Sequence, residues 1–291
     1  MKNNLNPLVT VYMPTHKRGA LINKAIDSVL SQSYKNLELI VCIDGFDGNT
    51  KEVLESYIKF DDRIKYVVND VALGACHARN RCINIAKGEF ITGLDDDDEF
   101  TPERIELFIK HFNSTADDII CTGRVYFDGE KYKKGNQSEG YITIEMLSNA
   151  NLIGNQIFTR TSYMKEVNCF DTNFPAWQDY DMWFRLIKHF GKCYKLSVPT
   201  YIFHVDDSRP RITTGSKAHE GYQCFIEKHR EALTKNQLRN LNIQDLLNRN
   251  QKLLFVNLIN NFTCMNFKIY VKEKLKKIKL IVSVRRFLLK L

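Results

Sequence analysis

The chain has 291 residues, of which 44% are hydrophobic, so it can bury a substantial core in one domain or two, which argues against disorder. Its formal net charge of +8 is confined to residues 268–291, which hold nine of the 42 Lys and Arg and one of the 34 Asp and Glu. The rest of the chain carries equal numbers of basic and acidic residues. With no recognised nucleic-acid motif, this distribution argues against nucleic-acid binding.

The first apolar stretch is interrupted by Pro14 and is too short for a signal peptide or a membrane span. Eight cysteines, Cys76 and Cys82 among them, form no CxxC pair and no metal-finger spacing. We therefore expect reduced, packed thiols and a cytoplasmic protein.

Apolar runs and helical patterns alternate over the first 120 residues, which predicts an α/β fold with a mainly parallel sheet covered on both faces. The expected helices have apolar residues three or four positions apart. In such sheets, ligands bind outside the carboxyl ends of the strands. The strands are expected at residues 8–13, 37–43, 64–68 and 90–94, and the helices at 20–32, 49–60 and 74–86.

Four consecutive aspartates at positions 95–98 follow the fourth predicted strand. Carboxylates packed this closely raise one another's pKa unless a cation neutralises them, so the run indicates a divalent metal or strong solvation. Oxygen ligands favour Mg²⁺, Mn²⁺ or Ca²⁺. A calcium-binding loop is excluded, because Phe100 stands where its sharp turn needs glycine.

The alternative interpretation of the acidic run is a solvated cap on a helix over residues 102–111. In that interpretation Thr101 is the N-cap, Pro102 lies in the first turn and Glu103 lies near the positive end of the helix dipole. Four preceding aspartates are more than a cap requires.

Three separated motifs resemble the family 2 inverting glycosyltransferases with the GT-A fold. They are VTVYMPTHKRGALINKAIDSVLSQSYKNLELIVCIDG, LGACHARNRCINIAKGEFITGLDDDDEFTPERI and PAWQDYDMWFRL, and the resemblance covers residues 7–115 and 175–186. It implies a UDP-sugar donor, a saccharide acceptor and a DxD motif in the aspartate run, with Mn²⁺ or Mg²⁺ as the cofactor. It further implies a nucleotide-sugar-binding half over residues 1–115, an acceptor half over 116–224 and a helical C-terminal region over 225–291.

The resemblance assigns the nucleotide site residue by residue. Asp44 would bind the uracil ring, although Ile43 replaces its acidic neighbour and the following residues depart from the family's Gly-Ser-x-Asp. Arg79 would reach the nucleotide; otherwise it is a helix-surface arginine paired with a nearby acid. The turn lining the uridine would be Pro14, Thr15 and His16. Asp96 and Asp97 would contact the ribose and the metal, with Asp95 as a second ligand.

Inversion needs a base on the face of the sugar opposite the leaving diphosphate, so a carboxylate distant from the acidic run is expected. The resemblance places this base at Asp179, ahead of an amphipathic helix; capping of that helix is the alternative. Gln178 stands where the family has Glu, and Asp181 is expected to cap the helix or bind Arg185. Candidates around the sugars and the diphosphate are Trp177, Gln178, Asp181, Trp183, Arg209 and Arg211, with His204 either completing the metal shell or serving as a structural residue.

The basic tail has apolar residues at helical spacing, at Leu275, Ile278, Ile281, Val284, Leu288 and Leu291. A basic amphipathic helix suits an anionic membrane surface, although a terminal helix docked on the domain gives the same pattern. With the resemblance, the tail predicts a peripheral enzyme on the inner face of the cell membrane, acting on a lipid-diphosphate-linked saccharide of a bacterial surface polysaccharide. Two alternatives stay open: a metal-dependent nucleotide-sugar hydrolase or nucleotidyltransferase, and an inactive membrane-associated binding module.

Overall fold

The computed structural model describes residues 6–154, 156–205 and 216–275. Contacts within the chain divide it into two compact units. The first holds the described residues of 6–147, 151–174 and 178–205, and the second those of 148–150, 175–177 and 216–275.

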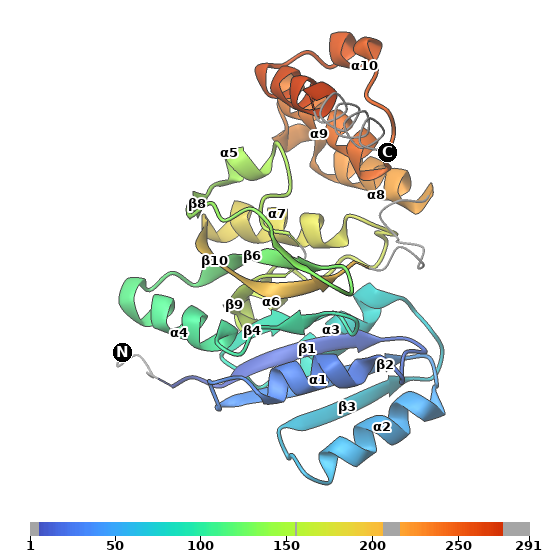
Figure 1. The fold of residues 1–291 in the computed structure, drawn as a ribbon, viewed down its shortest axis with the longest axis vertical. Helices are drawn as coiled ribbons and strands as arrows, with labels where there is room; N and C mark the ends of the chain where they lie inside the picture. The colour runs from blue at the N-terminus through green and yellow to red at the C-terminus, as the bar shows by residue number, and fades with distance from the viewer. Residues whose placement is uncertain (1–5, 155, 206–215, 276–291) are drawn as a thin grey trace, which may run out of the picture. The chain divides into compact units, whose positions relative to one another are not determined.

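Within its described residues, the first unit has one sheet of ten strands in the order β3-β2-β1-β4-β9-β6-β10-β5, with β7 beside β6 and β8 beside β10 (Figure 1). The strands are β1 (Val9–Thr15), β2 (Leu37–Asp44), β3 (Ile64–Asn69), β4 (Phe90–Gly93), β5 (Glu99–Phe100), β6 (Ile119–Phe127), β7 (Tyr132–Lys134), β8 (Gly140–Ile142), β9 (Phe158–Arg160) and β10 (Cys193–His204).

The four predicted strands are confirmed as β1 to β4, and neighbours among them run parallel. Every residue of β2 is buried, and its apolar run over residues 39–43 is typical of a parallel strand covered on both faces. Beyond β4 the sheet becomes mixed, because β9 lies antiparallel to both β4 and β6. The result is the predicted α/β fold with a mostly parallel central sheet.

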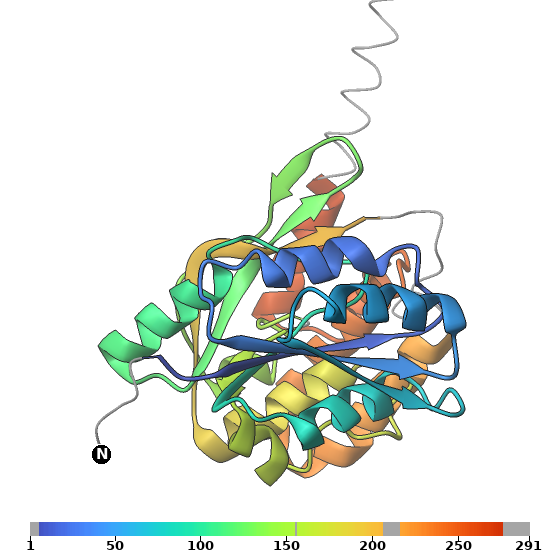
Figure 2. The ribbon, with the colours of Figure 1, turned by 90° about the horizontal axis from the view of Figure 1, so that it is seen from below.

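Helices cover both faces of this sheet: α1 and α2 lie on one side, and α3 and α7 on the other (Figure 2). The three helices expected before residue 90 are confirmed within two residues at each end. The helices of the first unit are α1 (Ile22–Leu30), α2 (Gly48–Ile58), α3 (Ala75–Ile85), α4 (Arg104–Thr115), α5 (Ile144–Leu147), α6 (Thr161–Glu166) and α7 (Gln178–Phe190).

Helix α4 corrects the predicted cap. It begins at Arg104, after Glu103, and no side chain caps it, so Thr101 is not the N-cap. Gln32, after the end of α1, binds this end of the helix instead. Its Oε1 accepts from the Ile105 N–H at 3.1 Å and its Nε2 donates to the Thr101 carbonyl at 2.8 Å. A residue 73 positions away in sequence thus satisfies an early amide of the helix.

Gly93, the last residue of β4, has no room for a side chain. A Cβ placed there would overlap the side chains of Gln156 and Tyr12. We therefore expect Gly93→Ala to lower the free energy of unfolding by about 1–3 kcal/mol, measured by urea denaturation. The matched control is Gly48→Ala in α2, where a Cβ meets open space and no loss is expected. Equal stability of the two variants would contradict this prediction.

The second unit is helical. It contains α8 (Ser216–His229), the 3-10 turn η1 (Arg230–Ala232), α9 (Lys235–Asn248), α10 (Phe255–Asn260) and a helix over residues 264–275. The buried Asp245 of α9 binds Arg249 at 2.7 Å and His219 of α8 at 3.0 Å. The predicted tail enters this unit as far as residue 275, and its residues 276–291 lie outside the described part of the chain. Among the described residues, no helix combines the length and apolarity needed to cross a bilayer.

Candidate active site

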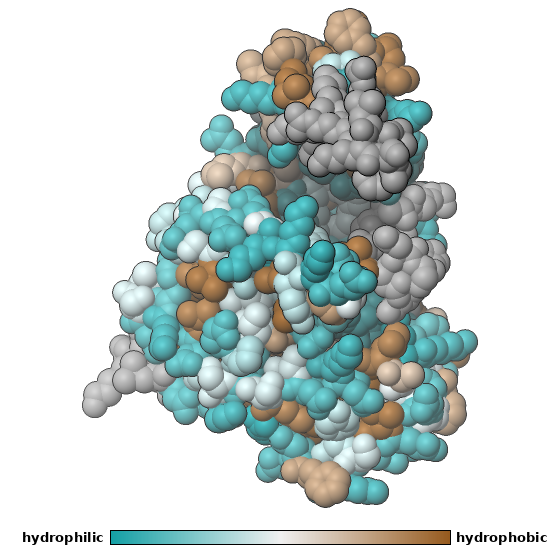
Figure 3. All heavy atoms as spheres, viewed as in Figure 1, coloured by the Kyte–Doolittle hydropathy of each residue, from teal (hydrophilic) through white to brown (hydrophobic). Residues whose placement is uncertain are grey.

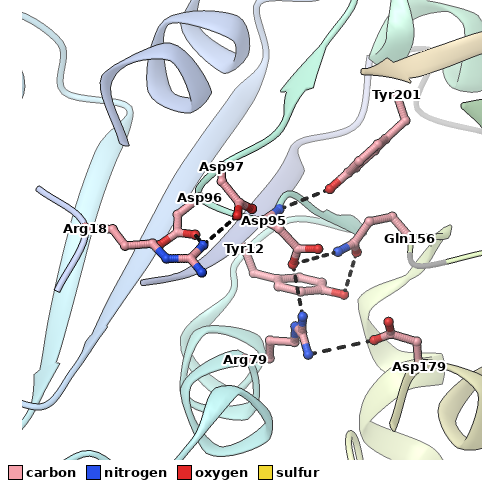
Figure 4. Close-up of polar contacts among 9 residues, drawn as sticks. All are labelled: Tyr12, Arg18, Arg79, Asp95, Asp96, Asp97, Gln156, Asp179 and Tyr201. Carbon is pink, nitrogen blue, oxygen red and sulfur yellow. Dashed lines mark hydrogen bonds and ion pairs between the residues drawn. The ribbon is translucent and has the colours of Figure 1, made fainter. Parts of the chain in front are cut away.

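The aspartate run stands at the carboxyl end of β4, at the sheet edge where ligands were expected (Figure 4). Its residues alternate in burial. Asp96 and Asp98 are 4% and 2% exposed, whereas the side chains of Asp95 and Asp97 are 25% and 32% exposed. Burial raises the pKa of Asp96 to about 6, although Arg18 opposes this shift, and burial also raises the pKa of Asp98. The run therefore offers two accessible carboxylates and two buried ones.

Arg18 supplies a counterion to this run. It lies in the loop that follows β1, and its Nη1 is 2.7 Å from Asp96 Oδ1 and 2.7 Å from Asp97 Oδ2. The acidic charge is thus partly neutralised by a guanidinium, a solution that the sequence reasoning did not include. The available signal was a basic residue just after β1, because β1 and β4 are parallel neighbours whose carboxyl ends share one edge.

Arg79 of α3 links the aspartate run to Asp179. Its Nη2 lies 2.9 Å from Asp95 Oδ1, and its Nη1 lies 3.7 Å from Asp179 Oδ1 (Figure 4). Arg79 is 5% exposed, so it is not the surface residue of the alternative interpretation. Burial opposes its charge, but Asp179 and Asp95 outweigh this effect and raise its pKa. Two carboxylates 84 positions apart therefore share one buried cation.

Asp179 lies in the first turn of α7, inside the helix that it was expected to precede, with its side chain 21% exposed. Burial raises its pKa to about 6; Arg79 works against this shift and Asp95 adds to it. Asp179 Oδ1 and Arg79 Nη1 are buried without a hydrogen-bond partner among the described residues. Because buried polar atoms in proteins are almost always paired, this spot suits a polar ligand such as a hydroxyl group.

Tyr12 and Gln156 complete the surroundings of Asp95. Tyr12 Oη donates to Gln156 Oε1 at 3.1 Å, and Gln156 Nε2 donates to Asp95 Oδ1 at 3.4 Å. The Asp95 backbone N–H donates to Tyr201 Oη at 3.3 Å. The sequence reasoning missed these residues because they come from β1, the segment before β9 and β10, which the long-range strand order brings together.

Asp44, at the end of β2, is 4% exposed and accepts hydrogen bonds from Asn69 Nδ2 and from the backbone N–H groups of Leu73 and Gly74, at 2.7–2.9 Å. It thereby fixes the loop that leads into α3. His16 is exposed and its Nδ1 contacts the Asp44 carbonyl, just beyond Pro14 and Thr15, which end β1. The structure thus gathers the predicted uridine residues at one edge, and their role remains a prediction.

The model of glycosyl transferase family 2 matches residues 10–170, more than half of the chain. The chain belongs to this family. A relative from Escherichia coli K12, a putative colanic acid biosynthesis glycosyl transferase WcaA, is 39% identical over 243 residues, which cover 79% of this chain and 84% of the relative. The predicted family resemblance is therefore confirmed.

Two further comparisons extend the family assignment. A Campylobacter jejuni relative named GalNAc(5)-diNAcBac-PP-undecaprenol beta-1,3-glucosyltransferase is 39% identical over 108 residues, covering 37% of this chain and 35% of the relative. The crystal structure of S. aureus TarS 1-349 in complex with UDP-GlcNAc superposes with a TM-score of 0.66 at 15% identity, over 82% of this chain and 72% of TarS. The latter likeness shows the fold and confirms the predicted GT-A architecture.

Two residues predicted to contact sugars in this family 2 glycosyltransferase are buried elsewhere. Trp183 is 0% exposed and its Nε1 donates to the Gly154 carbonyl at 2.8 Å, so it belongs to the core. Asp181 is also 0% exposed and binds Arg185 at 2.7 Å, as the alternative expected. Trp177 belongs to the second unit, where its partly exposed ring packs against Tyr222 at 5.4 Å, and its predicted role stays a proposal. Gln178 begins α7 and keeps its predicted role as a proposal.

The predicted metal set of Asp95, Asp97 and His204 is not assembled. Among the described residues, no group of three His, Cys, Asp or Glu side chains could hold a metal ion. His204 Nε2 is instead 2.7 Å from Glu99, and its backbone N–H donates to Asp98. Asp95 and Asp97 still fit Mn²⁺ or Mg²⁺, because such ions are held by one or two carboxylates when phosphate oxygens supply other ligands. Arg209 and Arg211 lie outside the described residues.

Proposed function

We propose that this glycosyltransferase moves a hexose or an N-acetylhexosamine from a UDP-sugar to an acceptor hydroxyl with inversion, forming a β-linkage. The observation that carries the proposal is the bridge made by Arg79, whose guanidinium lies 2.9 Å from Asp95 of the aspartate run and 3.7 Å from Asp179. The aspartates would face the donor nucleotide, and Asp179 would face the incoming hydroxyl.

Asp179 would act as the general base. Its ionised carboxylate would take the acceptor proton while the oxygen attacks the anomeric carbon from the face opposite the diphosphate. Arg79 would hold this carboxylate in place and favour its ionised form, against the effect of burial. Asp179 Oδ1 is buried and accepts no hydrogen bond from the described residues, so it would accept the hydrogen bond of the hydroxyl.

The leaving diphosphate gains charge as the bond to the sugar breaks. Mn²⁺ or Mg²⁺ held by Asp97 and Asp95 would neutralise that charge when bound. Asp96 would contact the ribose, and Asp44, Pro14, Thr15 and His16 would contact the uracil side of the nucleotide. TarS, which shares the fold, has been crystallised with UDP-GlcNAc, and this supports a UDP-sugar donor.

The acceptor is proposed to be a lipid-diphosphate-linked saccharide used for a bacterial surface polysaccharide. Support comes from the Escherichia coli relative, named for colanic acid biosynthesis, and from the Campylobacter jejuni relative, named for an undecaprenol-linked acceptor. The basic tail over residues 268–291 would bring the enzyme to the inner face of the membrane, where such a substrate lies.

The proposal predicts a pH profile. Because the base must be ionised and its pKa is raised to about 6, the transfer rate should level off above pH 7 and fall about tenfold per pH unit below pH 6. UDP affinity over the same range is the necessary control, since the pKa of Asp96 is also about 6 and the diphosphate titrates there too. A profile with its midpoint near pH 4 would contradict the assignment of Asp179.

A panel of UDP-sugars tests the proposed function. Slow release of UDP identifies the preferred donor, and that donor is then supplied with lipid-linked acceptors. We expect metal-dependent transfer to the saccharide and a product with inverted anomeric configuration by NMR. Release of free sugar at the same rate with and without every acceptor would instead indicate a nucleotide-sugar hydrolase.

A further inference from the structure

The second unit exposes large apolar side chains in and beside α10 and in the helix over residues 264–275. Phe255 is 62% exposed, Ile259 is 59% and Phe262 is 57%. Apolar side chains gather at this end of the second unit, at the top of the space-filling view (Figure 3). We call this set the apolar surface; it comprises Leu254, Phe255, Val256, Ile259, Phe262, Phe267, Val271 and Leu275.

The apolar surface is distinct from the core of its unit. Leu253 and Leu258, which are 6% and 4% exposed, point inward and attach α10 to the unit. The ring of Phe255 in α10 lies 6.3 Å from the ring of Tyr270, so the two helices that carry the apolar surface are neighbours. Single exposed apolar residues are normal on protein surfaces, but eight large ones within residues 254–275 indicate a contact site for a membrane or another protein.

The charges around the apolar surface are mostly basic. Exposed lysines stand at positions 252, 268, 272 and 274, and Glu273 is the acidic residue of the segment 250–275. Two copies of the chain meeting through this surface would bring like charges together. Anionic lipid head groups, in contrast, complement the lysines, and aromatic side chains favour the boundary between head groups and acyl chains.

We propose that the apolar surface binds an anionic bilayer, with its phenylalanines in the interfacial layer and its lysines against lipid phosphates. This contact would be made by residues 254–275, ahead of the segment 276–291 and in addition to any contact of the tail. Binding to the bilayer requires neither the sugar donor nor the acceptor, so it can be tested independently of the proposed transfer reaction.

The first test measures partition onto vesicles by sedimentation, with phosphatidylglycerol and phosphatidylcholine mixed and with phosphatidylcholine alone. The full-length chain carrying Phe255→Ser, Val256→Ser, Ile259→Ser and Phe262→Ser should bind the anionic vesicles at least about tenfold more weakly than the unsubstituted chain. All its basic residues remain. The control is Phe60→Ser, which removes a phenylalanine 91% exposed in the first unit and should bind normally.

The second test uses Cys264, which is exposed between Phe262 and Phe267, whereas Cys224 is partly buried and the other six cysteines are buried. A polarity-sensitive fluorophore on Cys264, in a Cys224→Ser background, should shift its emission to shorter wavelength when anionic vesicles are added. Unchanged partition of the fourfold variant together with no emission shift would overturn the proposal. If sedimentation equilibrium showed the unsubstituted chain to be a dimer and the variant with four serines to be a monomer, the apolar surface would instead serve self-association and the proposal would be overturned.

Discussion

Asp179→Asn is expected to lower the transfer rate by about 10³-fold while UDP affinity stays within about threefold of the unsubstituted enzyme. The asparagine keeps the shape of the side chain and can still accept a hydrogen bond, but it cannot take the acceptor proton. Initial rates with a UDP-sugar and a saccharide acceptor measure the loss, and calorimetric titration with UDP measures the affinity.

Asp181→Asn is the matched control on the same helix. Asp181 is fully buried against Arg185, so its substitution should lower the melting temperature and leave transfer by the folded enzyme within about threefold. If Asp179→Asn kept full activity, or if the two variants lost activity equally, Asp179 would not be the base.

Arg79→Met has the second largest expected effect, because it removes the shared partner of Asp95 and Asp179. Removing one member of a buried ion pair costs about 3–5 kcal/mol, so we expect a loss of that size in the free energy of unfolding at pH 8. The loss should be smaller at pH 5. Without Arg79 the pKa of Asp179 rises further in the folded state, so the unfolded chain releases the proton first and stability falls as pH increases.

Arg81→Met serves as the control for this prediction. Arg81 lies on the same helix but is exposed, and its Nη1 donates to Asn69 and to the Val68 carbonyl. Its loss should cost no more than about 1 kcal/mol. In transfer assays, Arg79→Met should also move the midpoint of the pH profile upward from about 6. Equal free energies of unfolding for the two variants at both pH values would show that the ion pairs of Arg79 stabilise the fold no more than the surface contacts of Arg81 do.

The sequence predicted the first half of the fold well because that half is built from local patterns. Strands β1 to β4 and helices α1 to α3 each have a clear apolar period, and parallel strands joined by helices have few alternative arrangements. The position of the aspartate run followed from the rule that ligands bind at carboxyl ends of strands, whereas Asp44 was assigned by the family resemblance. Such signals need no knowledge of distant contacts.

Local sequence patterns could not predict the contacts between the site residues. Gln156 reaches Asp95 because β9 inserts antiparallel beside β4, and Gln32 replaces the predicted cap of α4 from the end of α1. Arg18 reached the aspartates through the adjacency of β1 and β4. In each case the two partners are far apart in the sequence and are brought together by the tertiary fold, so no short stretch of sequence predicts the contact.

The burial of Trp183 was foreseeable from its helical position. Trp183 lies three residues before Leu186 and seven before Phe190, on the face of α7 that packs inward. Its aromatic ring favoured the interpretation as a surface on which sugars stack, whereas the spacing of the apolar residues in α7 predicts a core position. Asp179 lies four residues before Trp183, on the same face of α7, but it stands in the first turn of the helix, where its carboxylate is 3.7 Å from Arg79 Nη1.

The aspartate run is proposed to hold the donor while Asp179 serves the acceptor, and this division of the site is the central claim. Calorimetric titration with UDP and Mn²⁺ on Asp97→Asn and Asp179→Asn tests it most directly. We predict that Asp97→Asn weakens metal-dependent UDP binding by at least about tenfold, whereas Asp179→Asn leaves it nearly unchanged. Normal binding by Asp97→Asn together with lost binding by Asp179→Asn would contradict the claim.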